Sequence, residues 1–147
     1  MIKEFSGNIF DLRVDAITHG CNCEGYMGAG IAKEFKERYS DMFREYQQYC
    51  KLGMFKPGQV HFYRSLDGSK PHVINIATQE TRKSGAKIDY IRAGLKEIEK
   101  NYQVWGLRTL AMPKIGCGLG GLKWDEVKTL IYDIFTESTL EVVVVSN

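Results

Sequence analysis

The chain has 147 residues, of which 44% are hydrophobic and 26% charged, a composition that fits one globular domain and excludes a disordered protein. Its 20 basic and 18 acidic residues give a net charge of +2 with no block of like charges, so the sequence lacks the electrostatic footprint of a protein that binds duplex nucleic acid. Its apolar stretches fall far short of the ~20 residues of a membrane span, and no secretory leader precedes the four cysteines. We therefore expect a cytoplasmic protein with free thiols and no membrane partner.

The first part of the chain is predicted to form two strands and then two helices. Residues 2–5 alternate apolar and polar side chains, and residues 14–19 form an apolar run that leads into a glycine, so both segments are expected to be strands. Apolar side chains then recur at helical spacing over residues 31–39 and again over 43–50. We expect Ser40 to cap the second of these helices.

The rest of the chain is predicted to alternate strands with helices. Apolar periodicity and turn signals give strands at 60–63 and 73–78, a helix at 88–102, a strand at 107–112, a helix at 127–135 and a strand at 140–145. The turn signal Asp67-Gly68 indicates that the first two of these strands form a hairpin. This order predicts an α/β fold with a mixed, mostly parallel sheet between helices, in which ligands bind beyond the carboxyl ends of the strands.

Two glycine-rich loops follow predicted strands and lead into predicted helices. The 15 glycines make up about 10% of the chain, against an average of roughly 7%. One loop spans residues 20–30, and the other, at 113–122, has four glycines in six residues. Inward-turned amides and a helix N-terminus suit a phosphate, although a single such loop is equally a tight connection without a ligand. Two such loops on one sheet edge favour a diphosphate held between them.

Other nucleotide and metal motifs are missing. Lys33 stands where the dinucleotide fingerprint needs a glycine, and no Gly-Lys-Ser/Thr triplet is present. Cys21, Cys23 and Cys117 with His19 are residue types that bind zinc, but they lack the usual Cys-x₂₋₄-Cys spacing. We therefore expect no metal and no cofactor.

Three motifs together resemble the macro domain family. They are Gly7-Asn8-Ile9, the stretch 19–32 with His-Gly-Cys-Asn-Cys-Glu-Gly and Gly-Ala-Gly-Ile-Ala, and the stretch 113–124. The resemblance spans nearly the whole chain, so residues 1–147 are interpreted as a single macro domain. It is greatest for the branch that contains ADP-ribose 1″-phosphate phosphatases and enzymes that remove ADP-ribose from protein or DNA.

The resemblance implies a three-layer α/β/α fold whose crevice binds ADP-ribose. Asn8 and Ile9 would meet the adenine, and Asn22 the distal ribose. The phosphate loops would be formed by Met27, Gly28, Gly30 and Ile31 and by Gly116, Cys117, Gly118, Leu119 and Gly120. The expected partner is ADP-ribose or a derivative of it, with ADP-ribosylated protein or nucleic acid as further candidates.

Two departures from the family pattern bear on mechanism. The glycohydrolases of this branch use a lysine after the threonine that ends the central strand, and some add an aspartate in the second glycine loop. This chain has Gln79 and Gly120 at those places, although Lys83 or Lys87 could take the place of the lysine. Residues 81–87 are the most basic stretch and are expected to form a solvated loop that overhangs the crevice.

His19 is the remaining catalytic candidate, together with Asn22. The resemblance to the phosphatases places a functional histidine at this position, and an imidazole can accept a phosphoryl group or act as acid and base near neutral pH. The alternative is a strand-end histidine that only bonds to a neighbouring segment. His61 and His72 are expected to be ordinary surface or edge residues, and Trp124 a packing anchor.

Three functions remain open from the sequence. The leading hypothesis is a metal-independent hydrolase that removes a substituent from the distal ribose of ADP-ribose, with the 1″-phosphate as preferred leaving group. A second is hydrolysis of ADP-ribosyl bonds on protein or nucleic acid, with water positioned by the bound diphosphate. The third is a reader module that binds ADP-ribose without turnover.

Overall fold

The computed structural model describes residues 1–147 and is built on one six-stranded sheet. Its strands are β1 (Ile2–Ser6), β2 (Ala16–Cys21), β3 (Val60–Tyr63), β4 (His72–Ala77), β5 (Thr109–Met112) and β6 (Glu141–Ser146). They lie in the order β1-β6-β5-β2-β4-β3, and every neighbouring pair is parallel except the hairpin of β3 and β4. The predicted mixed, mostly parallel sheet and the predicted hairpin are thereby confirmed.

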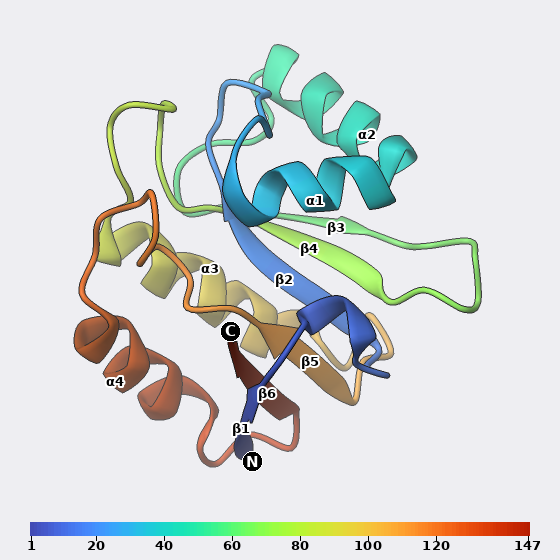
Figure 1. Cartoon of the computed structure of the whole chain (residues 1–147), viewed down its shortest axis with the longest axis vertical. Coiled ribbons are helices and arrows are strands. Elements are labelled where there is room, and N and C mark those ends of the chain that lie inside the picture. The colour runs from blue at the N-terminus through green and yellow to red at the C-terminus, as the bar shows by residue number, and fades with distance from the viewer.

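Helices cover both faces of the sheet. They are α1 (Gly30–Arg38), α2 (Ser40–Lys51), α3 (Ile88–Asn101) and α4 (Trp124–Phe135), with a short 3₁₀ helix at Ile9–Asp11. Helices α1 and α2 pack on one face and α3 and α4 on the other, which gives two separate apolar cores and the expected three layers (Figure 1). None of the helices combines the length and the apolarity that a membrane crossing requires.

Strand β4 shows why the central strands read as continuous apolar runs. Ile74 and Ile76 point into the core beneath α3 and α4, while Val73 and Ala77 point into the core beneath α1 and α2. Because both faces are covered, burying each large aliphatic side chain stabilises the fold by roughly 1.5–3 kcal/mol. The mid-helix glycine Gly94 belongs to the same packing, since a Cβ there would lie 2.4 Å from the side chain of Ile76.

The expected role of Ser40 is wrong. Ser40 is the first residue of α2, and Tyr39 occupies the N-cap position without a side-chain cap bond. Helix α1 runs almost directly into α2, because the Tyr39 amide donates to Phe35 at the end of α1 and its carbonyl accepts from Phe43 in α2. The backbone of one residue therefore serves both helix ends.

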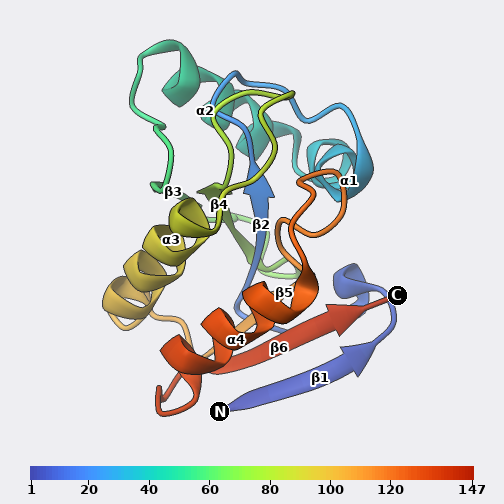
Figure 2. The ribbon, with the colours of Figure 1, turned by 90° about the vertical axis from the view of Figure 1, so that its left-hand side faces the viewer.

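The loops that follow β2, β4 and β5 gather at one end of the sheet (Figure 2). Backbone bonds join them: the Cys23 amide donates to the Glu80 carbonyl at 3.2 Å, and the Ala86 amide to the Gly120 carbonyl at 2.9 Å. The glycine-rich loops of residues 20–30 and 113–122 therefore face each other across the carboxyl ends of the strands, as their positions after β2 and β5 predict.

Candidate functional site

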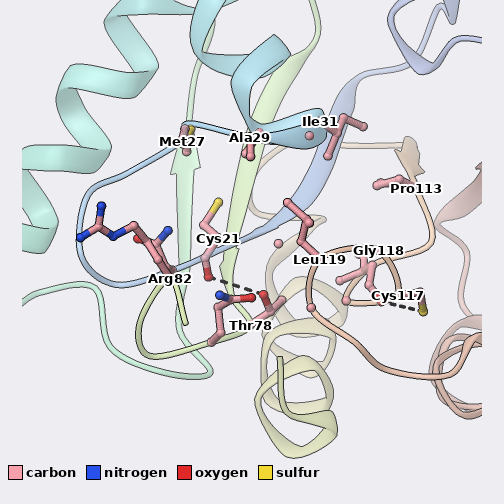
Figure 3. Close-up of a pocket in the computed structure, with 18 of the residues that line it drawn as sticks. Cys21, Met27, Ala29, Ile31, Thr78, Arg82, Pro113, Cys117, Gly118 and Leu119 are labelled. Atoms are coloured by element: carbon pink, nitrogen blue, oxygen red, sulfur yellow. Dashed lines mark hydrogen bonds between the residues drawn. The ribbon is translucent and has the colours of Figure 1, made fainter. Parts of the chain in front are cut away.

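A cavity of about 800 Å³ lies between the two glycine-rich loops (Figure 3). Residues 20–22 and 26–32 form one wall and residues 113–120 the other, while Thr78, Gln79 and Arg82 come from the loop after β4. In Figure 3, Arg82 lies on the opposite side of the cavity from Cys117 and Gly118. The volume falls in the range of ligand pockets, roughly 300–1,000 Å³.

Most residues that the sequence assigned to the ligand line this cavity. They are Asn22, Met27, Gly28, Gly30, Ile31, Gly116, Cys117, Gly118, Leu119 and Gly120. Because most of them are glycines or small loop residues, what they offer to a ligand is chiefly backbone. The structure thus brings both phosphate-loop predictions to one site.

Glycine is required at particular points of the second loop. Gly116 has φ +75°, and a Cβ on Gly120 would lie 2.7 Å from the Gly116 carbonyl oxygen and 2.9 Å from the Ala86 Cβ. The Gly116 carbonyl also accepts from the Leu122 amide at 2.9 Å. The loop is therefore folded tightly on itself, at a distance that no side chain tolerates.

The charge distribution of the cavity suits an anion. No aspartate or glutamate lines it, whereas Arg82 and Lys114 do. Helix α1 begins at Gly30, and the N-cap residue Ala29 makes no side-chain cap bond, so the first amides of the helix are left without a cap at the cavity wall. Unpaired amides, a helix dipole and two cations together favour phosphate groups.

Asn22 organises the first loop by hydrogen bonds. Its Oδ1 accepts from the amides of Glu24 at 3.0 Å and Tyr26 at 3.4 Å and from the Tyr46 hydroxyl at 3.0 Å, while its Nδ2 donates to the Tyr26 carbonyl at 2.8 Å. An amide has two donor hydrogens, so one stays free for a ligand. Asn22 is therefore both a scaffold residue and a wall of the cavity.

His19, the catalytic candidate, does not reach the cavity. Its side chain is fully buried, and its ring stacks on Phe35 with centroids 3.8 Å apart, because the alternation of β2 turns it toward α1. Burial lowers its pKa from 6.5 to about 4, against the opposing effect of its hydrogen bond to Asn75. The prediction that His19 contacts the substrate is therefore wrong. His19 is a neutral histidine of the core.

His19 belongs to a buried polar row that crosses three strands. Its Nε2 lies 2.7 Å from Asn75 Oδ1, and Asn75 Nδ2 lies 3.0 Å from Nδ1 of His61, whose Nε2 lies 2.7 Å from Glu45 Oε1. These distances assign one set of roles: each imidazole Nε2–H donates, and the row ends on the carboxylate of Glu45. His61 is only 2% exposed, so it is not a surface residue, although it lies on β3, an edge strand of the sheet.

The burial of His19 makes the stability of the protein depend on pH. Between pH 6.5 and 4 the unfolded chain binds a proton at this residue and the folded chain does not. The contribution of His19 to the free energy of unfolding is therefore complete above pH 6.5 and is lost as the pH falls toward 4. We expect His19 alone to cost about 3 kcal/mol of unfolding free energy between pH 7 and pH 4. Urea unfolding of the wild type and of His19→Gln over this range measures it, and equal pH slopes in the two proteins would contradict it.

Asn8 and Ile9, assigned to the adenine by resemblance, lie outside the cavity. The Asn8 side chain caps the 3₁₀ helix by accepting from the Phe10 amide at 2.9 Å, and Ile9 packs in the core beneath α1 and α2. Both residues therefore have structural partners of their own.

The cysteines and lysines considered from the sequence also divide into residues that line the cavity and residues that do not. Cys21 and Cys117 line the cavity, but all four cysteines are free, and no three metal-binding side chains come together. Lys83 and Lys87 are exposed and are not part of the wall. Arg82 and Tyr26, both at the cavity, were not named as site residues from the sequence.

Comparisons with known proteins agree with this geometry. The family model described as Macro domain matches residues 18–131. The DNA ADP-ribosyl glycohydrolase of Mycobacterium tuberculosis is 34% identical over 139 residues, which cover 93% of this chain but 39% of that protein. The chain thus spans about two fifths of the length of the glycohydrolase relatives that it matches.

Solved structures and a fungal relative add to this similarity. The macrodomain of Mycobacterium tuberculosis DarG superposes with a TM-score of 0.95 at 31% identity and covers 100% of this chain and 98% of that one. Thermosipho africanus DarTG in complex with ADP-ribose gives a TM-score of 0.87 at 30% identity, over 95% of this chain and 39% of that one. An ADP-ribose 1″-phosphate phosphatase of Aspergillus oryzae is 42% identical over 82 residues, 55% of this chain and 38% of that protein.

Proposed function

Because the chain belongs to the macro domain family, we propose that its cavity binds ADP-ribose and that the protein hydrolyses the bond between C1″ of the distal ribose and a nucleobase of DNA. The observation that carries the proposal is the cavity itself. Two glycine loops present backbone amides to a space that has two cations and no acidic side chain in its wall. The similar DarTG structure holds ADP-ribose, and the similar mycobacterial glycohydrolase acts on ADP-ribosyl DNA by its name.

The side chains at hand favour a mechanism that depends on positioning. No Asp, Glu or His lines the cavity, and burial raises the pKa of the thiols of Cys21 and Cys117, so neither thiol serves as a base at neutral pH. The amides of the loops would hold the diphosphate, and Asn22 would orient the distal ribose through its free Nδ2–H.

In the reaction the bond from C1″ to the base breaks and its electron pair stays on the base. A water molecule held beside the diphosphate adds its oxygen to C1″ and loses a proton to solvent, and the departing base takes up a proton from solvent on the opposite face. The positive charge that develops on the ribose in such a transition state is stabilised by the adjacent phosphates.

The 1″-phosphate stays the second candidate substrate. His19 favours this substrate only if its side chain reaches the cavity, and the side chain is fully buried instead. The identity of 42% to a fungal phosphatase over 82 residues supports keeping it. A reader module is favoured by one observation, that no general base lines the cavity.

Chromatography of reaction mixtures separates these functions. The protein is incubated with a single-stranded oligonucleotide that carries ADP-ribose on one base and, in parallel, with ADP-ribose 1″-phosphate. We expect free ADP-ribose from the oligonucleotide at a kcat/KM at least about tenfold above that for the phosphate, a difference of 1.4 kcal/mol in transition-state stabilisation. Release from the phosphate alone would reverse the order of substrates, and binding of both without release would identify a reader.

A further inference from the structure

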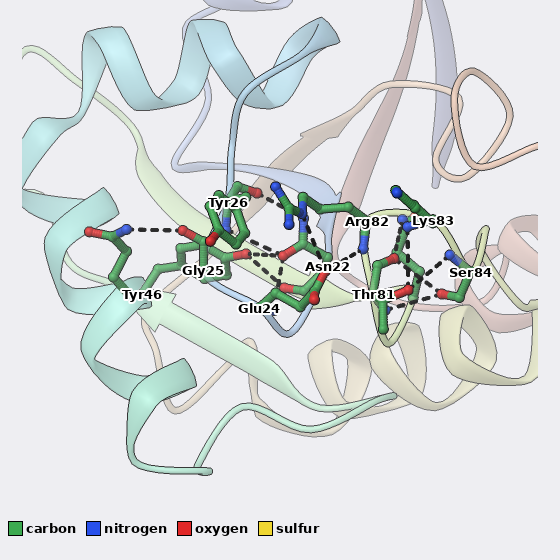
Figure 4. Close-up of polar contacts among 11 residues, drawn as sticks. Asn22, Glu24, Gly25, Tyr26, Tyr46, Thr81, Arg82, Lys83 and Ser84 are labelled. Carbon is green, nitrogen blue, oxygen red and sulfur yellow. Dashed lines mark hydrogen bonds and ion pairs between the residues drawn. The ribbon is translucent and has the colours of Figure 1, made fainter.

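One rim of the cavity is a stacked pair formed by Arg82 and Tyr26. The Arg82 guanidinium carbon lies 3.7 Å from the centroid of the Tyr26 ring (Figure 4). Glu24 fixes the arginine from the side: its Oε1 accepts from the Arg82 amide at 2.7 Å and lies 3.5 Å from Arg82 Nε. The pair is thus oriented before any ligand binds.

Both planes of the pair are open to solvent as well as to the cavity. The side chain of Arg82 is 53% exposed, Tyr26 is 49% exposed, and both residues line the cavity. Half-exposed aromatic and guanidinium planes at a cavity mouth leave faces on which a ligand can stack. Such planes are the surfaces on which unpaired bases stack in complexes with single-stranded nucleic acids.

Hydrogen bonds place this pair at the distal-ribose end of the site. Asn22 donates to the Tyr26 carbonyl at 2.8 Å and accepts from the Glu24 amide at 3.0 Å, so the residue proposed to orient the distal ribose is bonded to Tyr26 itself and to Glu24, which holds Arg82. A group attached to C1″ of that ribose points away from the diphosphate. Asn22, Tyr26 and Arg82 all line the cavity, so a group on C1″ of a ribose held by Asn22 would have Tyr26 and Arg82 as neighbours.

We propose that Arg82 and Tyr26 form a leaving-group subsite in which the nucleobase joined to C1″ stacks on the guanidinium plane. The inference rests on the proposed function and goes beyond it by assigning the residues that select a base over other leaving groups. Arg82 stabilises the negative charge that the base gains as the bond breaks. It is a positioning and electrostatic residue and gives up no proton, since a guanidinium stays charged.

The surroundings favour a nucleic acid strand as the carrier of that base. Lys83 and Lys87 are exposed on the same loop as Arg82, and Lys114 stands on the opposite wall. Glu24, from the loop after β2, is occupied by Arg82, and Glu80 is the one acidic side chain of the loop that carries Arg82. Lys114 on the wall and exposed lysines on the loop that carries Arg82 suit the phosphates that flank a base in a single strand.

The experiment compares Arg82→Ala, Arg82→Lys and Tyr26→Ala with the wild type. Each protein is titrated with ADP-ribose and assayed on the ADP-ribosylated oligonucleotide and on ADP-ribose 1″-phosphate. Arg64→Ala is the matched control, because Arg64 lies over the Phe62 ring with its guanidinium carbon 5.1 Å from the centroid, and neither residue lines the cavity.

Loss of the stack should act on the oligonucleotide beyond any effect on ADP-ribose binding. We expect Arg82→Ala and Tyr26→Ala to lower the kcat/KM for the oligonucleotide at least about tenfold more than they lower the affinity for ADP-ribose, the effect of losing one base–aromatic stack. Arg82→Lys keeps the charge and loses the plane, so it should lose activity on the oligonucleotide and keep activity on the phosphate. Arg64→Ala should match the wild type throughout.

Two results would contradict the proposed subsite. Both can be told apart from a failure of the proposed function. If Arg82→Ala lowers kcat/KM equally on both substrates, Arg82 acts through its charge and not as a surface on which the base stacks. If it lowers kcat/KM on neither substrate, Arg82 has no role in the site. Both cases leave ADP-ribose bound to the wild type. Absence of ADP-ribose binding by the wild type would instead overturn the proposed function, and the subsite with it.

Discussion

Gly120→Val should abolish ADP-ribose binding, with an affinity loss of at least about 100-fold, which equals 2.7 kcal/mol. Any side chain at this position starts from a Cβ that lies 2.7 Å from the Gly116 carbonyl oxygen and 2.9 Å from the Ala86 Cβ. The Gly120 carbonyl also accepts from the Ala86 amide at 2.9 Å, so the loop cannot move away without losing that bond. Overpacking of this kind costs about 1–3 kcal/mol of stability as well.

Calorimetric titration and thermal unfolding of the same samples test this prediction. Gly68→Val is the matched control, because a Cβ at Gly68 meets nothing within 4 Å and the residue is not part of the cavity. The control should bind like the wild type. Wild-type affinity and stability in Gly120→Val would show that the second loop does not shape the binding site.

Asn22→Asp should lower the affinity for ADP-ribose by about 10–100-fold, or roughly 1.4–2.7 kcal/mol. The carboxylate keeps oxygen acceptors for the Glu24 amide and the Tyr46 hydroxyl, so the loop retains much of its support. It loses the Nδ2 donor to the Tyr26 carbonyl and the second Nδ2–H, which is proposed to orient the distal ribose. It also places a negative charge in a cavity without acidic side chains, next to an anionic ligand.

Asn22→Ala distinguishes the loss of loop support from the effect of the added negative charge. It adds no charge but removes the oxygen acceptors, so it should also lower the unfolding temperature. Gln103→Glu is the control for net charge, because it makes the same amide-to-acid change at an exposed position away from the cavity. Titration with ADP-ribose measures all three. Wild-type affinity in Asn22→Asp would remove Asn22 from the site.

The elements and both glycine loops could be predicted because their signals are local. Apolar periodicity marks a helix or strand within about ten residues, and a glycine cluster between a strand and a helix marks a loop whatever the rest of the chain does. Parallel order then places loops 20–30 and 113–122 at one edge. No knowledge of side-chain contacts was needed for that step.

The histidines could not be placed because their environment depends on strand register. His19 and His61 both pair with Asn75 in the sheet, one from each side, and this row becomes visible only when the pairing of three strands is known. A buried amide that bonds two imidazoles allows polar side chains in a strand core, and of the ring nitrogens in this row Nδ1 of His19 is left without a partner. From the sequence alone, each histidine reads as an isolated polar residue.

The Arg82–Tyr26 pair was missed for a related reason. The two residues are far apart in the chain and come from loops after β2 and β4, whose conformations no periodic pattern fixes. The basic stretch 81–87 was expected to overhang the crevice, but its residues were not told apart, and Arg82 is the one that lines the cavity. Of them, Arg82 lines the cavity because Glu24 holds its amide and its side chain together.

The most direct test of the account is calorimetric titration of the wild-type protein with ADP-ribose and, on the same preparation, with AMP. The account places the diphosphate between two loops and the distal ribose at Asn22, so ADP-ribose should bind at one site and at least about 100-fold more tightly than AMP, a difference of 2.7 kcal/mol. Equal affinity for the two ligands, or no heat of binding up to about 1 mM ADP-ribose, which corresponds to −4.1 kcal/mol, would contradict it.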